Sequence, residues 1–193
     1  MHATAIRPAI AVPADEVDNR AAYVGFAFAY VLGHGAAALA PVVALPTWLP
    51  IGLLAAGLVA GTILAVAASL RAQRGATESR RRAEKLVGTA WVTGFAALAL
   101  AITGLSTVSD APELQGVLWP AGSTIVVGLI YLAEGAVRRN TLHYHLGTWL
   151  ALVAAASLFV PAPGFFAVLA VLGGGAYLVA AVLERRRLTS LTG

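Results

Sequence analysis

Long apolar stretches alternate with short polar segments along this chain. Six of the stretches are each about twenty residues long, the length that an α-helix needs to cross a hydrocarbon core of about 30 Å. The pattern predicts an all-α polytopic membrane protein in which residues 21–187 form a domain of six transmembrane helices. A polar arm, 1–20, precedes this domain, and a short tail, 188–193, follows it. The predicted spans are 21–40, 51–70, 86–106, 115–137, 141–160 and 165–183.

Basic residues gather in four of the polar segments. The thirteen Lys and Arg residues lie in the N-terminal arm, in the loop 71–85, at Arg138 and Arg139, and in the segment 185–187. Consecutive clusters are separated by enough apolar sequence for two crossings. Because basic residues near helix ends remain on the cytoplasmic side of a membrane, we expect three helical hairpins with both termini in the cytoplasm. The expected location is the cell (cytoplasmic) membrane.

The composition is that of a membrane protein rather than a soluble one. Apolar residues make up 59% and charged residues 11% of the chain, whereas soluble domains average about 45–50% and about 25%. The net charge of +4 is best matched by the anionic headgroups of the bilayer, so we expect no nucleic-acid partner. Richness in Ala, Gly and Val favours a bacterial protein.

A cleaved signal peptide is the alternative interpretation of residues 1–40. Ala38-Leu39-Ala40 resembles a cleavage site and follows an apolar stretch. A signal sequence, however, has a basic lead and a shorter apolar core, whereas this lead contains Asp15, Glu16 and Asp18. We therefore expect the first span to be retained.

Small residues line one face of the first span and part of the second. They recur at every fourth position, which allows another backbone to approach closely, and they are Gly25, Ala29, Gly33 and Ala37, followed by Gly57 and Gly61. We expect these residues to pack helices within the chain, with a homo-oligomer or a membrane-complex partner as the alternative. In size and six-span layout the chain resembles the substrate subunits of ECF-type vitamin transporters, which use small residues on their first helix.

His34 is the one ionisable residue that the pattern places deep in a span. An intramembrane ionisable residue is a candidate functional site, although a neutral imidazole also serves structurally, for example in a hydrogen bond to Tyr30 one turn earlier. No second deep His or carboxylate is predicted to complete a proton relay or a bis-His haem site. Buried charge is therefore expected to be scarce, which argues against ion-coupled pumping.

Glu134 is a third intramembrane candidate, after His34 and Tyr30. It precedes Arg138 by four residues, in the favourable order for a helical ion pair, so we expect it to pair at the cytoplasmic end of its span. Glu184 is expected to do the same beside Arg185. His143 and His145 are expected to contact headgroups, because a separation of two residues on a helix directs them too far apart to share a metal ion.

The loop 71–85 carries six basic residues against two acidic ones. Contact with anionic lipid explains them, and docking of an acidic soluble partner is the alternative. The residues assigned to this contact are Arg80, Arg81, Arg82 and Lys85.

Catalytic and cofactor motifs are missing from the sequence. It contains no cysteine and no HExxH, GxSxG or GxxxxGK pattern, and the pattern predicts no metal site and no cofactor. We therefore expect no enzyme. The favoured function is transport, as an oligomeric carrier or channel for a small solute or as the membrane subunit of a larger transporter. The alternative is a non-catalytic regulatory or scaffolding membrane protein that acts through its basic loop.

Overall fold

The computed structural model describes residues 16–191, and within that range it consists of helices and the turns between them, without a strand. The all-α prediction is confirmed. The first helical segment comprises α1 (Arg20–Phe28), a π-helical turn η1 (Ala29–His34) and α2 (Gly35–Val43). It is followed by α3 (Trp48–Gln73), α4 (Glu78–Val108), a 3-10 turn η2 (Pro112–Leu114), α5 (Gln115–Arg138) and α6 (Thr141–Ser157). The last segment comprises α7 (Gly164–Val168), η3 (Leu169–Gly173) and α8 (Gly174–Ser190).

Five of these six helical segments are long and apolar enough to cross a membrane. The sixth, α6, has 17 residues and ends before the predicted 160, because the chain turns ahead of Pro161. The break between α5 and α6 is short: Arg139 adopts a left-handed conformation with φ 53°, and the side chain of Asn140 caps α6 by accepting the N–H of His143. These helices indicate a membrane protein.

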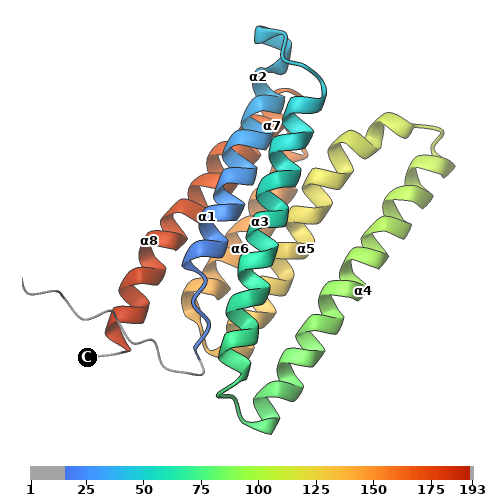
Figure 1. Ribbon diagram of the computed structural model, residues 1–193. Coiled ribbons are helices and arrows are strands. Elements are labelled where there is room, and N and C mark those ends of the chain that lie inside the picture. Colours follow the sequence, from blue (N-terminus) through green and yellow to red (C-terminus); the bar gives the residue numbers. More distant parts are fainter. Residues whose placement is uncertain (1–15, 192–193) are drawn as a thin grey trace, which may run out of the picture.

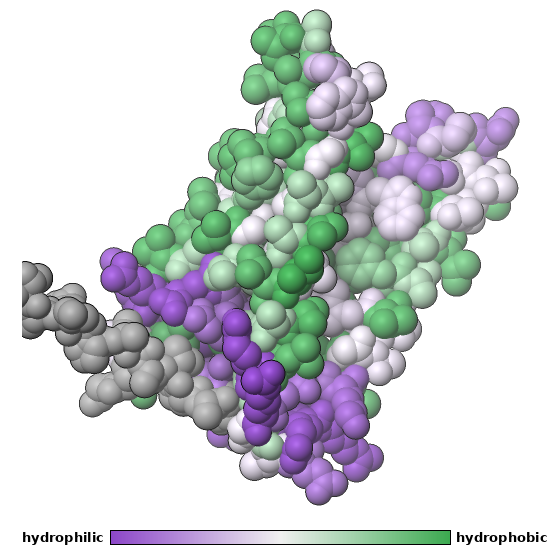
Figure 2. Space-filling view, in the orientation of Figure 1, coloured by the Kyte–Doolittle hydropathy of each residue, from purple (hydrophilic) through white to green (hydrophobic). Residues whose placement is uncertain are grey.

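The outer surface of the bundle is apolar. Figure 2 shows hydrophobic residues along the helices and hydrophilic residues gathered at the lower end, with a second group at the α4–α5 turn. Large side chains that a soluble protein would bury are exposed here, among them Val42, Ile51, Val92, Leu100 and Phe159. Such a surface suits contact with lipid, whose acyl chains replace water as the solvent.

The helices are not packed equally closely. α5 packs most extensively against α6, and α1 packs against α3 and α8. α3 and α4 are consecutive in sequence but make almost no contact, and α4 stands apart on one side of the bundle (Figure 1). The grouping into three hairpins is not confirmed, since α5 and α6 belong to different predicted hairpins. The start of α1 and the end of α8 lie at the same end of the bundle (Figure 1).

The small residues of the first span contact those of the second within one chain. A Cβ atom added to Gly25 would lie 2.7 Å from Cα of Gly61, and one added to Gly57 would lie 2.5 Å from the backbone nitrogen of Ala29. Gly33 is equally close to Leu54. Ala37, further along, is half-buried. Close backbone approach therefore joins α1 and η1 to α3.

Glycines also bring α5 and α6 together. A Cβ atom on Gly147 would lie 2.5 Å from the carbonyl oxygen of Gly128 and from the backbone nitrogen of Leu132. Gly135 meets the backbone of Tyr144 in the same way. This contact positions the C-terminal half of α5 against the start of α6, where the candidate site lies.

Tyrosine side chains fill the centre of the bundle. The ring of Tyr177 on α8 lies 6.3 Å from that of Tyr23, 5.3 Å from that of Tyr30 and 6.4 Å from that of Tyr131. All four side chains are buried. This core joins α1, α5 and α8, and its hydroxyl groups need polar partners inside the protein.

Candidate functional site

A cavity of about 610 Å³ lies between α3 and α4, with α1 and α5 behind it. Its volume is within the range of small-molecule sites, about 300–1,000 Å³. Most of its wall is apolar or aromatic, including Phe26, Leu58, Val66, Trp91, Phe95 and Tyr131. Three of the α3 residues on this wall are also exposed to the exterior, so the cavity is open on that side: Leu58, Val66 and Leu70.

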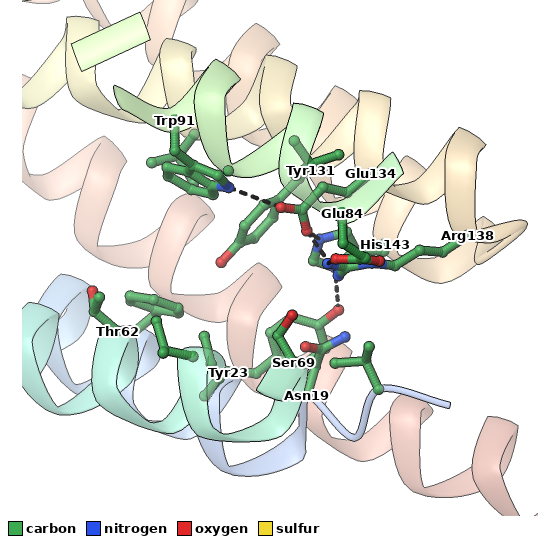
Figure 3. Close-up of a pocket in the computed structure, with 18 of the residues that line it drawn as sticks. Asn19, Tyr23, Thr62, Ser69, Glu84, Trp91, Tyr131, Glu134, Arg138 and His143 are labelled. Carbon is green, nitrogen blue, oxygen red and sulfur yellow. Dashed lines mark hydrogen bonds and ion pairs between the residues drawn. The ribbon is translucent and has the colours of Figure 1, made fainter. Parts of the chain in front are cut away.

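Two facing helix surfaces form the sides of the cavity. α3 contributes residues spaced four, three and four apart, which lie on one helical face: Leu58, Thr62, Ala65 and Ser69. α4 contributes a face with the same spacing: Glu84, Gly88, Trp91 and Phe95. Figure 3 shows Thr62 and Ser69 on one side of the space and Trp91 and Glu84 on the other. The cavity exists because these two helices do not close against each other.

Charged residues close one end of the cavity. The guanidinium of Arg138 on α5 donates to both carboxylate oxygens of Glu84 on α4, at 2.7 Å and 2.6 Å. It also donates to Oε2 of Glu134 at 2.9 Å. Nε1 of Trp91 donates to the other oxygen of Glu134 at 2.8 Å. Glu84 and Glu134 are buried, so a bidentate ion pair and an indole hydrogen bond tie α4 to α5 inside the protein.

His143 on α6 connects this cluster to Tyr23 on α1. Its Nε2 lies 3.1 Å from Oε2 of Glu134, and its Nδ1 lies 2.6 Å from the hydroxyl of Tyr23. A carboxylate only accepts hydrogen bonds, so Nε2–H donates to Glu134, and in the neutral imidazole Nδ1 accepts from the Tyr23 hydroxyl. The ring of Tyr131 lies 4.1 Å from the imidazole. The order hydroxyl, imidazole, carboxylate can pass a proton between the cavity wall and the ionic cluster.

Asn19 lines the same end of the cavity and is incompletely satisfied. Its backbone N–H donates to Glu184 at 3.3 Å. Its side-chain nitrogen Nδ2 is the one buried side-chain nitrogen or oxygen in the described part of the chain that has no hydrogen-bond partner. The residue as a whole is 5% exposed. A buried donor without an acceptor is costly.

A second ionic cluster holds the start of the described chain to α8. Arg187 donates to both oxygens of Glu184, at 2.8 Å and 3.0 Å, and to Glu16 at 2.9 Å. At the start of α1, the guanidinium of Arg20 donates to Asp18 at 2.9 Å and 2.7 Å and holds the pKa of that carboxyl below its ordinary value. The pair between Glu16 and Arg187 thereby joins the start of the described chain to α8, at the same end of the bundle as the charged end of the cavity.

The structure brings Glu134 and Tyr30 to the cavity wall but not His34. His34 is buried, with its ring 5.0 Å from that of Tyr30 and 6.2 Å from that of Phe166. The hydrogen bond between His34 and Tyr30, which was one possible structural role of this histidine, does not form. The rings meet edge to face, and the Tyr30 hydroxyl lies 2.6 Å from that of Thr124 instead.

The expectation that buried charge is scarce is also wrong. Glu134 forms its expected pair with Arg138, but both belong to a larger buried cluster that includes Glu84 and His143. His143 is 3% exposed and does not face headgroups. A histidine that could exchange a proton with a buried carboxylate is thus present, because His143 lies beside Glu134. The sequence pattern had placed His143 at the surface.

The expected pair between Glu184 and Arg185 is also wrong. Glu184 is fully buried and pairs with Arg187 rather than with its neighbour Arg185. The i,i+3 spacing of Glu184 and Arg187 was the signal in the sequence, because residues three apart share a helix face whereas adjacent ones do not.

The four basic residues assigned to lipid or partner contact lie in the first turns of α4, since this helix begins at Glu78 within the predicted loop 71–85, and they lie outside the cavity lining. Arg81, Arg82 and Lys85 are exposed, and Arg80 is half-buried. Glu84 lies in the same helical turn but points inward to Arg138. Within residues 16–191, no group of three or more His, Cys, Asp or Glu side chains could hold a metal ion.

Comparisons with known proteins leave the site to be interpreted from its own geometry. No protein-family model, no curated protein and no solved structure matches this chain.

Proposed function

We propose that the protein binds a small, mostly apolar solute in the cavity between α3 and α4 and acts in its transport. It does so either as a self-contained oligomeric carrier or as the membrane subunit of a larger transporter. The observation that carries this proposal is the cavity of about 610 Å³, apolar and aromatic along most of its wall and polar at one end. Sites for small ligands combine such a wall with a few placed polar groups.

The orientation in this proposal places the charged end of the cavity in the cytoplasmic leaflet of the cell membrane. Basic residues support it, since they cluster at the end of the bundle where α1 begins and α8 ends and such residues remain in the cytoplasm. Both termini are then cytoplasmic, and the spans form three hairpins in sequence order. The opening between α3 and α4 faces lipid, so an apolar solute enters from the membrane rather than from water.

A neutral fluorophore tests the cavity directly. N-phenyl-1-naphthylamine is titrated into the protein in lipid nanodiscs, with empty nanodiscs subtracted. Ala65→Trp fills the lining of α3, and we expect it to weaken binding by about tenfold or more, equivalent to about 1.4 kcal/mol. Ile63→Trp, two residues away on the same helix, is the matched control, because Ile63 is 63% exposed and is absent from the cavity lining.

The outcome separates a cavity from nonspecific partitioning. Saturable binding that Ala65→Trp weakens and Ile63→Trp preserves supports the proposal. Equal binding by both variants and the unaltered protein would show that the fluorophore dissolves in lipid or at the protein surface, and the proposal would then be abandoned.

Regulation or scaffolding through the basic loop is the second candidate. The exposure of Arg81, Arg82 and Lys85 favours it, because solvated basic side chains are available to an acidic partner. Affinity purification from native membranes in mild detergent tests it. A stoichiometric soluble protein that is lost when these three residues are changed to Gln supports docking, whereas recovery of the chain alone favours the self-contained carrier.

A further inference from the structure

The charged residues that line the cavity leave it with a net negative charge. Two carboxylates, Glu84 and Glu134, face one guanidinium, Arg138, and His143 is neutral when its Nδ1 accepts from Tyr23. With His143 in that neutral form, the formal charge of the lining is −1. In a medium of low dielectric constant such a charge strongly favours a positively charged ligand over a negative one.

Hydrogen bonding in the cluster points the same way. Each of the three guanidinium nitrogens of Arg138 already donates to a carboxylate. The carboxylates are not saturated, because an ionised oxygen can accept about two hydrogen bonds. Oε1 of Glu134 accepts one, from Trp91. Two of the five N–H groups of Arg138 remain, but an anion that met them would lie beside two carboxylates, whereas a cation can join the carboxylates as they stand.

Aromatic faces continue the site away from the carboxylates. The ring of Trp91 stacks on Phe95 at 6.1 Å, and its edge meets Tyr131 at 5.9 Å. Both Trp91 and Tyr131 line the cavity within the polar end drawn in Figure 3. The negative face of an indole or phenol ring attracts an organic cation most strongly where water is excluded.

Asn19 gives an independent sign of a ligand. Its Nδ2 donor is buried without a partner and lies at the end of the cavity where Tyr23 meets His143 (Figure 3). A donor in that position is completed by an acceptor atom on a bound molecule. The carboxylates, the aromatic faces and this amide therefore match three parts of one ligand: its positive charge, its apolar body and its hydrogen-bond acceptor.

We infer that the solute is a lipophilic organic cation that carries a hydrogen-bond acceptor close to its charge. Its apolar body lies along the aromatic and aliphatic wall, its charge lies beside Glu134 and Trp91, and its acceptor meets Asn19. This inference rests on the proposed function, since it names the class of solute that the same cavity takes.

Two ions of the same shape and opposite charge test the sign of the site. Tetraphenylphosphonium and tetraphenylborate are titrated into the protein in nanodiscs, with empty nanodiscs subtracted. We expect the cation to bind at least about tenfold more tightly than the anion, a difference of about 1.4 kcal/mol. Tetraphenylborate binding as tightly as the cation, or more tightly, would overturn the inference.

Substitutions test whether the preference for the cation comes from the charged residues at the end of the cavity. Glu134→Gln neutralises the lining while Arg138 keeps its bidentate pair with Glu84, so we expect the preference for the cation to disappear. The double variant Glu84→Gln with Arg138→Gln removes one charge of each sign and retains the net charge of −1, so the preference should persist. An unchanged preference in a folded Glu134→Gln protein would contradict the inference. Should Glu134→Gln not fold, the double variant and the unaltered protein still decide.

Asn19 is tested with a pair of cations that differ in one group. Benzyl(2-hydroxyethyl)dimethylammonium carries a hydroxyl where benzyldimethyl(propyl)ammonium carries a methyl, and each is measured in competition with tetraphenylphosphonium. We expect the hydroxyl compound to compete better in the unaltered protein and the advantage to vanish in Asn19→Leu. If the hydroxyl compound competed no better than the propyl compound in the unaltered protein, the ligand would not need a hydrogen-bond acceptor, and this part of the inference would be wrong.

The neutral fluorophore distinguishes loss of the cation preference from loss of the cavity. Fluorophore binding that Ala65→Trp weakens, together with no preference for tetraphenylphosphonium, would reject the cation and leave the carrier standing. Fluorophore binding that ignores Ala65→Trp would reject the cavity itself.

Discussion

The two sides of α5 are packed in different ways. Toward α6, backbones meet directly at Gly128, Gly135 and Gly147. Toward α4, the close contacts involve side-chain ends: a Cβ atom on Gly94 would lie 3.1 Å from a methyl of Val126, and one on Gly122 would meet a methyl of Leu98. A contact between two backbones cannot loosen unless one of the helices moves, whereas a contact made by side-chain methyl groups can loosen when the side chain changes rotamer.

Polar contacts replace backbone packing along α4. Only Glu84, Ile102 and Ser106 of its 31 residues are buried. At one end Glu84 and Trp91 bond to α5, and at the other Nε2 of Gln115 donates to the hydroxyl of Ser106 at 3.1 Å. These contacts hold α4 to α5 and leave its face toward α3 uncovered, and the cavity occupies that space. Because α6 is joined to α5 by backbone contacts and α4 by side-chain contacts, α6 is the more firmly held of the two helices and α4 is the wall of the site that can shift more easily.

The largest expected effect comes from filling the contact between α5 and α6. Gly147→Leu forces a side chain against backbone atoms of α5, which cannot give way as a side chain can, so we expect a cost at or above the upper end of the usual range for overpacking, about 1–3 kcal/mol. We expect no monodisperse folded protein by size-exclusion chromatography and circular dichroism. Gly104→Leu on α4 is the control, because nothing lies within 4 Å of its added Cβ. Equal yields of folded protein for Gly147→Leu and Gly104→Leu would show that the side of α5 facing α6 is no more tightly packed than the side facing α4.

The next effect is loss of the guanidinium that bridges α4 and α5. Arg138→Gln leaves Glu84 and Glu134 buried without a counter-charge, and breaking a buried pair in this way costs about 3–5 kcal/mol. We expect a lower thermal midpoint in nanodiscs. The double variant with Glu84→Gln should recover part of the loss, because one of the unpaired charges is then removed. A double variant less stable than Arg138→Gln alone would show that the two residues act independently.

Helix number and many helix ends were predictable from the sequence. Apolar length predicts a span, and Asn140 marks the start of α6 because its side chain accepts the N–H of His143. Thr77 does the same for α4 by accepting from Arg80. These features depend on residues close together in the sequence.

The ionic cluster was not predictable because its members come from separate helices. Glu84 and Arg138 are 54 residues apart, and Tyr23 and His143 are 120 apart. Hydropathy reports how apolar a segment is but not which neighbour its charged residue meets. The repeated spacing of Glu84, Gly88 and Trp91 was available as a hint of one polar and aromatic face on α4.

A smaller effect follows from removing one hydrogen bond between α4 and α5. Trp91→Phe keeps an aromatic ring against Phe95 but removes the donor to Glu134. A hydrogen bond to a charged group contributes about 1.5–3 kcal/mol, so we expect a modest fall in the thermal midpoint, less than for Arg138→Gln. Trp48→Phe serves as the control, since Trp48 is 68% exposed. A fall as large for Trp48 would point to general aromatic anchoring in the membrane.

The smallest effect concerns charges that lie on α4 but face outward. Arg81 and Arg82 are exposed, and surface substitutions usually change stability by no more than about 0.5 kcal/mol. We expect the Arg81→Gln, Arg82→Gln protein to unfold like the unaltered one in zwitterionic nanodiscs. In anionic nanodiscs it should lose part of the stabilisation that anionic lipid gives, because each basic residue near such a surface contributes about 1 kcal/mol. If instead the variant unfolded as early as Arg138→Gln in zwitterionic lipid, these outward charges would be holding α4 in place, and the buried cluster would not be the contact that sets the wall of the cavity.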